Sequence, residues 1–316
     1  MKQFLHASVR KCCALALIAL SASTTSFGQE QYESYWEMGM TLGPSNFLGD
    51  LGGTQGKGTT FLKDNNFSMT KIAVGAFAQY TWRQTIGLRL AVNFGSLEGD
   101  DAAIKGKGGL EEARKIRNSN FKSPLTEAMA LLEVYPTVFL EGDADDTWLK
   151  FRPYLVGGVG VFKFKPKGQH PVTGEWVELQ PLSTEGQGFP EYPDRKPYKL
   201  TQLNIPMGFG VKYFVSENVH LALEVLHRKT FTDYIDDVSS NYIDPTLFYN
   251  YLGSKADLAA TMANKSLFQA NPTRFGAGDK RGTPSNNDGY YSFNLKFGFR
   301  LVSNRFGNST RCPIVF

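Results

Sequence analysis

The feature of this sequence that most restricts its fold is a strict alternation of apolar and polar residues over long segments. From Tyr291 to Leu301 every second residue is apolar, and residues such as Lys296 and Arg300 stand between the apolar ones. A period of two indicates β-strands, because successive side chains of a strand point to opposite faces. Strands in soluble proteins are typically about 5–6 residues long, whereas a membrane-spanning strand needs about 9–11. The length of this segment therefore favours a strand that crosses a membrane.

Seven earlier segments carry the same alternation. They are residues 35–43, 70–82, 85–96, 127–140, 148–164, 199–215 and 218–230. With the last segment they predict eight strands, and bacterial outer-membrane barrels have an even strand number. Short helices are expected at 110–116 and at Ala256–Ala263, outside the strands.

The connections between these segments alternate in length. Three are short and four are long: 83–84, 141–147 and 216–217 against 44–69, 97–126, 165–198 and 231–289. Outer-membrane barrels have short periplasmic turns and longer extracellular loops. We therefore expect residues 29–302 to form an all-β, eight-stranded, antiparallel up-and-down barrel in the outer membrane, with both termini in the periplasm.

The first 28 residues have the form of a secretory signal peptide. Lys2, Arg10 and Lys11 precede an apolar run at 12–20, which is too short to span a bilayer, and small residues follow at 26–28. An uncleaved N-terminal anchor is the alternative. Cleavage would remove three positive charges and take the formal net charge from +4 to +1, so no nucleic-acid partner is expected. Cys312, the only remaining cysteine, lies in a predicted periplasmic tail, 303–316.

The direction in which each strand face points separates a membrane barrel from a soluble, lipocalin-like one. A soluble barrel turns its apolar face inward, whereas a membrane barrel turns it toward lipid. Here the apolar faces are nearly free of charge and the polar faces are rich in glycine, which suits a crowded lumen facing away from outer-membrane lipid. Charged residues predicted to meet in that lumen are Glu37, Arg89, Glu133, Lys150, Arg152, Lys212, Glu224, Arg228, Lys296 and Arg300. Buried charges need partners, so we expect a salt-bridged plug; a selective ion pore is the alternative.

No motif in the sequence indicates catalysis, a cofactor or a metal centre, and we expect a protein that is not an enzyme. His227 with Ser239 or Ser240 is the one conceivable nucleophile and base pair. The acid-rich run at 233–238 has the oxygen ligands that Ca²⁺ prefers, but its spacing is not that of an EF-hand. A turn with capping acids explains this run equally well.

Two segments together resemble a known family. The first, 45–53, contains Gly49, Asp50 and Leu51; the second, 228–239, contains Thr232, Asp233, Tyr234, Asp236 and Asp237. With the eight-strand layout they look like the PorG-like outer-membrane barrels of the Bacteroidetes, over essentially the whole mature chain. This resemblance implies a non-enzymatic accessory of the type IX secretion and gliding machinery, which anchors periplasmic ring proteins similar to PorK and PorN. The alternative is a surface barrel of the OmpA or OmpX type, whose extracellular loops bind an external ligand.

Overall fold

The structure is a computed structural model that describes residues 34–51, 67–104, 111–140, 150–216, 218–269, 272 and 275–301. All of these fall in one compact unit, Ser34–Phe316. The predicted signal peptide, the turn at 141–147, the tail and Cys312 lie outside the described residues. Within the part of the chain that is described, no helix is long and apolar enough to cross a membrane.

Eight antiparallel strands close into a barrel, which confirms the predicted fold class. They follow one another around the barrel as β1, β2, β3, β4, β5, β8, β9 and β10, and β10 pairs back to β1. Their bounds are Tyr35–Leu48 (β1), Lys71–Trp82 (β2), Ile86–Asp100 (β3), Asn120–Val134 (β4), Phe151–Phe164 (β5), Thr201–Phe214 (β8), Val219–Thr230 (β9) and Gly289–Leu301 (β10).

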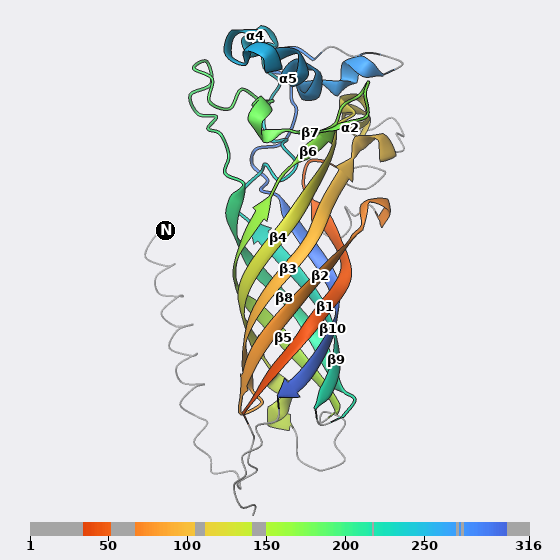
Figure 1. The fold of residues 1–316 in the computed structure, drawn as a ribbon, viewed down its shortest axis with the longest axis vertical. Coiled ribbons are helices and arrows are strands. Elements are labelled where there is room, and N and C mark those ends of the chain that lie inside the picture. Colours follow the sequence, from red (N-terminus) through yellow and green to blue (C-terminus); the bar gives the residue numbers. More distant parts are fainter. Residues whose placement is uncertain are drawn as a thin grey trace, which may run out of the picture. The chain divides into compact units, whose positions relative to one another are not determined.

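The two ends of the barrel differ, and we name them by their connections. At the turn end, β2 joins β3 through 83–85 and β8 joins β9 through 215–218. At the loop end lie the hairpin of β6 (Lys167–Gln169) and β7 (Trp176–Glu178) and the helices α2 (Glu111–Arg117), α4 (Thr246–Tyr251) and α5 (Ala256–Ala263) (Figure 1). The loop-end connections also contain the 3-10 turns η2 (Phe67–Met69), η3 (Asp101–Ala103), η5 (Gln180–Leu182), η6 (Gly253–Lys255) and η7 (Lys265–Phe268). Both helices expected from the sequence are therefore present, as α2 and α5.

The apolar faces of the strands point away from the lumen. Large apolar side chains stand exposed around the barrel, including Phe293, Phe297 and Phe299 at 43–50% exposure. Their polar neighbours on the same strand are buried; Lys296, for example, is 0% exposed. An exposed apolar band over a polar interior is the arrangement of a membrane barrel and the reverse of a soluble one.

Aromatic residues gather near the turn end of this band. Trp36 packs on Tyr80 with ring centroids 5.1 Å apart, and Phe151 packs on Tyr213 at 4.8 Å. Tryptophan and tyrosine are enriched at the two interfaces between membrane and water. These pairs therefore mark where the apolar band ends at the turn end.

The lumen is crowded enough that some positions accept only glycine. Gly298 faces the lumen on β10, and a Cβ added there would lie 2.1 Å from Cε1 of His220. Its partner across the strand pair, Gly39, would place a Cβ 2.1 Å from the carbonyl oxygen of Phe297. The glycines on the polar faces thus make room for large side chains that fill the barrel.

Several strand boundaries differ from the prediction, among them the end of β1, which runs to Leu48 instead of residue 43. The expected strand at 127–140 instead runs over Asn120–Val134, and residues 136–140 form a 3-10 turn, η4 (Pro136–Leu140). Pro136 has no N–H to donate to a strand ladder, so the strand ends before it. The expected loop at 97–126 shrinks correspondingly, because β3 continues to Asp100.

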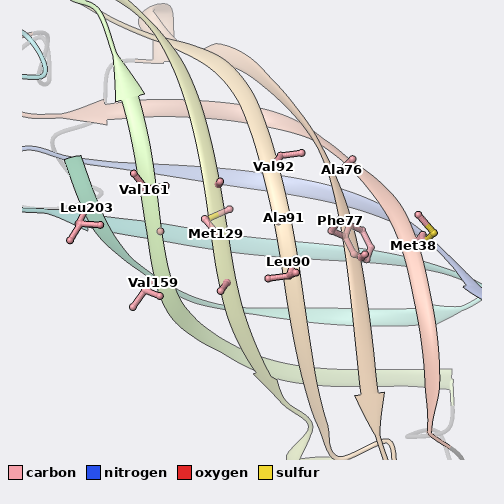
Figure 2. A pocket seen from close by; sticks show the side chains of 14 residues that line it. Met38, Ala76, Phe77, Leu90, Ala91, Val92, Met129, Val159, Val161 and Leu203 are labelled. Atoms are coloured by element: carbon pink, nitrogen blue, oxygen red, sulfur yellow. The ribbon is translucent and has the colours of Figure 1, made fainter. Parts of the chain in front are cut away.

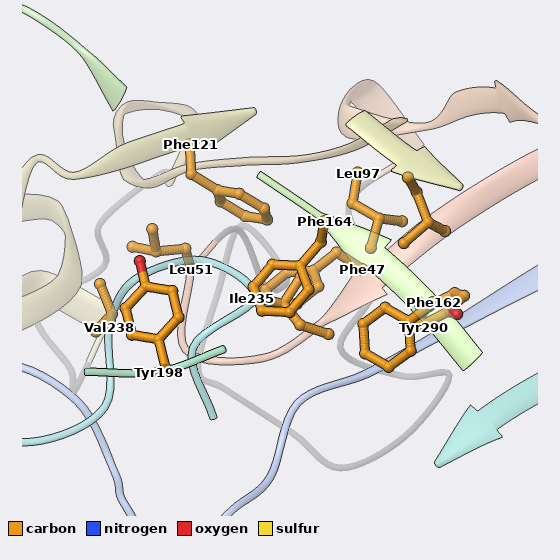
Figure 3. Close-up of a cluster of buried hydrophobic side chains, with 11 residues drawn as sticks. Phe47, Leu51, Leu97, Phe121, Phe162, Phe164, Tyr198, Ile235, Val238 and Tyr290 are labelled. Carbon is orange, nitrogen blue, oxygen red and sulfur yellow. The ribbon is translucent and has the colours of Figure 1, made fainter. Parts of the chain in front are cut away.

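The reason for the missed strand ends is that the polarity of the inner face inverts near the loop end. Leu97, Phe121, Leu125 and Phe164 face inward yet are apolar, and each is at most 8% exposed. They pack with Phe47, Leu51, Phe162, Tyr198, Ile235, Val238 and Tyr290 in an apolar cluster that closes the barrel beneath the loops (Figure 3). The inward face of these strands is polar in the membrane part and apolar near the loop end, so no single alternation pattern describes the whole strand.

Candidate functional site

Six charged side chains from different strands meet in the lumen. Glu133 on β4 lies at their centre: its carboxylate is 2.7 Å from Nη1 of Arg89 and 2.9 Å from Nζ of Lys296. Nζ of Lys212 is 3.5 Å away. Tyr135 donates its hydroxyl to the same carboxylate. Glu133 is therefore held by three cations and a phenol at once.

The other two acids of this cluster complete a balanced set. Glu224 accepts from Arg89 at 2.8 Å, and Glu37 accepts from Lys212 at 2.6 Å. The cluster thus contains three carboxylates and three cations, and each of the six residues is at most 3% exposed. Desolvating a charge is costly unless it is paired, and each member of this set has an oppositely charged partner within the set. Its chemistry is that of a packed interior rather than of a hydrated ion path.

A second ion pair lies closer to the loop end and contains a residue that the sequence analysis did not single out. Glu127 lies 3.2 Å from Nη2 of Arg228, and it accepts from Asn204 at 2.7 Å and from Tyr290 at 2.8 Å. Glu127 is six residues before Glu133 on the same strand. The period of two places both on one face, so the alternation contained the signal for it.

The remaining predicted lumen residues lie apart from these clusters. Arg152 is buried near the turn end, where Nη1 donates to Gln84 at 2.7 Å. The Arg300 guanidinium lies 3.7 Å from the ring centroid of Tyr35. Lys150 is exposed and does not face the lumen, contrary to the prediction, because β5 begins only at Phe151 and the alternation does not extend back to it.

At the loop end, two long connections fold into a packed unit with its own core. Side chains from the 165–198 connection, such as Leu182 and Phe189, pack against Phe248 of α4 and against Ala259 and Met262 of α5. These five side chains are each at most 5% exposed. Loops that only bridged strands would not need such a core, so this end of the molecule has a defined shape.

Buried ion pairs fasten these connections to one another. Glu185 lies 2.7 Å from Nη1 of Arg281 and also accepts from the backbone N–H groups of Ser239 and Ser240. Arg117 of α2 lies 2.7 Å from Asp101 within the β3–β4 connection, and it donates to the backbone carbonyls of Arg281 and Asp50 in two other connections. The hydroxyl of Ser240 donates to Glu185 at 2.7 Å, so this serine is bonded to a carboxylate that tethers loops, and the arrangement is not that of a nucleophile poised by His227.

The two segments that carry the family resemblance lie together at the loop end. The backbone N–H of Leu51 donates to Oδ2 of Asp236 at 3.0 Å, and a Cβ added to Gly49 would lie 2.2 Å from Oδ1 of Asp288. Asp50 accepts from the N–H of Thr283 at 2.6 Å. The lack of a side chain at Gly49 lets the backbone of the first segment approach Asp288, and Asp288 in turn contacts the second segment.

The second segment is anchored through its aromatic and acidic side chains. Tyr234 stacks on Tyr198 with centroids 4.8 Å apart, and Asp237 accepts from the Tyr198 hydroxyl at 2.6 Å. Thr232 accepts at its carbonyl from the N–H of Asp288 at 2.9 Å. Residues far apart in the chain therefore form one closely bonded unit over the mouth of the barrel.

Three aspartates of this unit, Asp233, Asp236 and Asp288, are buried near one another. Burial, together with repulsion from the Asp50 and Glu185 carboxylates, raises the pKa of Asp233 to about 8. Burial, with repulsion from neighbouring aspartates, also raises the pKa of Asp236 and of Asp288 well above the usual range. Among the described residues, no group of three or more His, Cys, Asp or Glu side chains is arranged to hold a metal ion. Burial thus favours the protonated form of Asp233 and Asp236 in the acid-rich run, and the geometry of the described residues does not favour the Ca²⁺ interpretation.

Hollows in the surface of the described residues include three of interest. One, of about 670 Å³, lies on the outside of the barrel, and its lining includes Ala76, Ala78, Ala128 and Ala130. Larger side chains such as Met38 and Leu203 also line it (Figure 2). This hollow lies on the apolar outer face of the strands, which a membrane barrel turns toward lipid. The second, of about 610 Å³, lies beside α4 and α5. The third, of about 370 Å³ and mostly polar, lies at the tip of the β6–β7 hairpin.

Comparison with known proteins places these observations in a family. The model of the outer membrane protein beta-barrel domain family matches residues 12–251. A search of curated proteins found no match.

Solved structures of bacterial surface barrels also match, at low similarity. A major outer membrane protein from Thermus thermophilus is 14% identical, with 84% of this chain and 99% of that chain covered and a TM-score of 0.35. Neisserial surface protein A is 10% identical, with 85% and 99% covered and a TM-score of 0.34. The attachment protein Ail of Yersinia pestis, in complex with the heparin analogue sucrose octasulfate, is 8% identical, with 84% and 99% covered and a TM-score of 0.34. TM-scores this low carry no inference about function.

Proposed function

This chain belongs to the outer membrane protein beta-barrel family, and on that premise we propose that it is a closed, non-catalytic anchor in the outer membrane whose loop end faces outward and binds a partner there. The observation that carries the proposal is the contrast between the two ends. The loop end has a core of its own and buried ion pairs, whereas two of the turn-end connections are only three and four residues long, at 83–85 and 215–218.

The lumen supports an anchor rather than a channel. Its charged cluster is balanced, and the six residues in it are at most 3% exposed. A small barrel of eight strands is filled by its own side chains. We therefore expect the purified protein in a planar bilayer to show no discrete ion conductance; steady single-channel steps would contradict the closed lumen.

The proposed orientation also places both ends of the barrel chain in the periplasm. Trp36 near the start of β1 pairs with Leu301 at the end of β10, and both lie at the turn end. Short turns of outer-membrane barrels face the periplasm, which supports this direction.

Orientation is tested by labelling single cysteines in intact cells. Both cysteine variants, Val172→Cys and Phe139→Cys, are made in a Cys312→Ser background. Val172 lies at the tip of the β6–β7 hairpin and is 71% exposed, and Phe139 lies at the turn end and is 78% exposed. A membrane-impermeant maleimide should label the first and not the second. Labelling of Phe139→Cys alone would overturn the proposed orientation.

The partner is tested from the same surface. A photo-crosslinking residue at Tyr249, which is 57% exposed on α4, should capture a protein or glycan outside the cell. The matched control is the same residue placed at Leu223, which is exposed on the barrel wall and should capture only lipid. Equal capture from both positions would contradict a dedicated outer binding surface.

A second function, a structural role in type IX secretion, is favoured by two observations. The segments that carry the resemblance to PorG-like barrels are bonded to each other through Leu51 and Asp236. At the turn end, Phe139 and Leu140 are 78% and 65% exposed, which offers an apolar contact to periplasmic ring proteins similar to PorK and PorN. Co-purification of ring proteins that is lost on Phe139→Ala with Leu140→Ala supports this role. Normal secretion in a deletion strain would contradict it.

A further inference from the structure

The polar hollow at the tip of the β6–β7 hairpin has the composition of a ligand site. We call it the hairpin pocket. It is formed where the hairpin turn meets the start of β4 and the junction of α5 with η7, and its lining includes Asn118, Asn120, Gln169, His170, Lys265 and Phe268. Among the described residues that line it, none is an aspartate or a glutamate.

Lys265 is the unusual member of this lining. Its side chain is buried, with the residue 3% exposed, and Nζ donates to Oδ1 of Asn120 at 2.7 Å and to the Asn120 carbonyl at 3.4 Å. Among the described residues, no carboxylate lies within ion-pair distance of it. The other two buried cations of the loop end, Arg117 and Arg281, each lie 2.7 Å from a carboxylate. Lys265 is therefore a buried positive charge without a matching negative one.

The electrostatics of Lys265 agree with this geometry. Burial, with repulsion from Arg281, lowers its pKa to about 8, and more distant aspartates only partly offset that effect. A buried charge lacking a partner is costly. A negative group in the pocket would stabilise the ammonium form.

The neighbours of Lys265 present donors to the pocket. Oδ1 of Asn120 already accepts from Lys265 and from the N–H of Gln169 at 2.9 Å, so its Nδ2 is the group left to donate. Nδ1 of His170 accepts from the N–H groups of Val172 and Thr173, both at 3.2 Å, which assigns the ring proton to Nε2. A ligand that suits an ammonium and several N–H donors is rich in acceptors and negative.

The sheet beside the pocket adds positive charge. Lys122 on β4 lies directly opposite Lys167 on β6, and like charges in that position repel. Asn120 and Gln169 lie two residues along from these lysines, so all four share one face of the sheet. Three acids share this face: Glu98 lies opposite Lys122 and is paired with Lys71, Glu178 lies opposite Lys167 and is paired with Lys165, and Asp100 lies opposite Asn120. The strip of four lysines and three acids therefore carries a net charge of +1 next to the pocket.

We propose that the hairpin pocket binds an oxyanion, a phosphate or sulfate group, with Lys265 as its charged anchor and Asn120 and His170 as further donors. Charge-assisted hydrogen bonds to such oxygens are among the strongest a protein makes, and Lys122 and Lys167 would attract the anion from solution. This inference deepens the proposed outer binding function by naming a ligand class.

The position of the pocket on β4 suggests two sources for the anion. Thr126 on β4 lies near the loop-end limit of the outward-facing apolar residues. Asn120 lies six residues further along β4 toward the loop end, and for a tilted strand this places it about 15 Å above that limit. That height suits the phosphate of an outer-leaflet glycolipid headgroup, and it also suits a phosphate or sulfate on a soluble ligand or polymer.

The test is a titration of the full-length protein in detergent with sodium sulfate, at ionic strength held constant with sodium chloride, followed by backbone amide NMR or calorimetry. We expect saturable binding that weakens at least about tenfold in Lys265→Met, because the anchoring charge is gone. Lys255→Met removes an equally positive but exposed lysine of η6 and should leave binding unchanged. Equal binding by the wild type and Lys265→Met, or no saturation, would overturn the proposal.

Two further measurements test the site without relying on the Lys265→Met variant. His170→Ala changes a partly exposed side chain and should weaken binding severalfold even if Lys265→Met fails to fold; unchanged binding would count against the site. Because Lys265 loses its proton near pH 8, sulfate affinity should fall between pH 7 and pH 9.5. A flat profile would exclude Lys265 as the anchor.

The source of the anion is distinguished by competition. Vesicles with and without lipopolysaccharide are added to the sulfate complex: displacement only by the lipopolysaccharide vesicles assigns the site to a lipid headgroup, and no displacement assigns it to a soluble anion. Detergent-solubilised protein has no inside or outside, so a failure of the proposed orientation in cells leaves this binding result untouched. Loss of sulfate binding likewise leaves the orientation result untouched.

Discussion

The lumen and the loop end bury charge in opposite ways. In the lumen, Glu133 alone is within 3.5 Å of three cations, and the cluster around it is neutral overall. At the loop end, Asp236 and Asp288 are buried beside other acids, while Lys265 is buried without one. The charges of a balanced set neutralise one another, whereas buried groups with strongly shifted pKa values gain or lose protons more readily within the physiological range. The comparison therefore directs the tests of structural stability to the lumen and the tests of pH and ligand dependence to the loop end.

The strongest test of this contrast removes the central acid of the lumen. Glu133→Gln should lower the free energy of unfolding by about 3–5 kcal/mol, because Arg89, Lys296 and Lys212 then share too little negative charge. Urea unfolding in lipid vesicles, followed by tryptophan fluorescence, measures the loss.

A matched control uses a carboxylate outside the cluster. Glu175 is exposed next to the hairpin tip, so Glu175→Gln should change the unfolding free energy by at most about 0.5 kcal/mol. If both variants unfold alike, the lumen cluster does not hold the barrel together.

A smaller effect is expected from crowding in the same lumen. Gly298→Ala would place a Cβ 2.1 Å from the His220 ring, and relieving that clash should cost about 1–3 kcal/mol of stability. Gly157→Ala is the control, because the nearest atom to its added Cβ is the Pro206 carbonyl oxygen at 4.0 Å. Thermal unfolding of the two variants in detergent compares them, and an equal midpoint would show that the lumen is looser than this packing implies.

The membrane part of this contrast was predictable from sequence, whereas at the loop end the short helices α2 and α5 were predictable but the buried contacts were not. Residues such as Glu37, Arg89 and Glu224 could be assigned to the lumen because polarity alternates strictly where one face meets lipid and the other faces the lumen. Beyond the membrane, inward residues such as Phe121 and Leu125 become apolar, so the alternation loses its meaning.

The contacts of the loop end depend on residues far apart in the chain. Glu185 and Arg281 are separated by 96 positions and joined only by the tertiary fold. No local pattern distinguishes such an ionic pair from two solvated charges. The burial of Lys265 without a paired carboxylate cannot be predicted from the sequence for the same reason. It depends on which carboxylates the tertiary fold places close to Lys265.

The smallest expected effect, and the sharpest for the loop end, is its pH dependence. The folded-state pKa values of Asp233, Asp236 and Asp288 are raised, so these groups hold protons in the folded state that the unfolded state releases at lower pH. Stability contributed by this region should therefore fall as pH rises from about 4 and level off only above the folded-state pKa, near 8 for Asp233.

Limited proteolysis of the loop end should run at least about threefold faster at pH 9 than at pH 6, whereas unfolding of the barrel strands should not follow this trend. Asp233→Asn should flatten the profile by removing one titrating group at nearly constant shape. A cleavage rate that instead rises on acidification would mean that these carboxylates are ionised and stabilising, and the contrast between the two regions would fail.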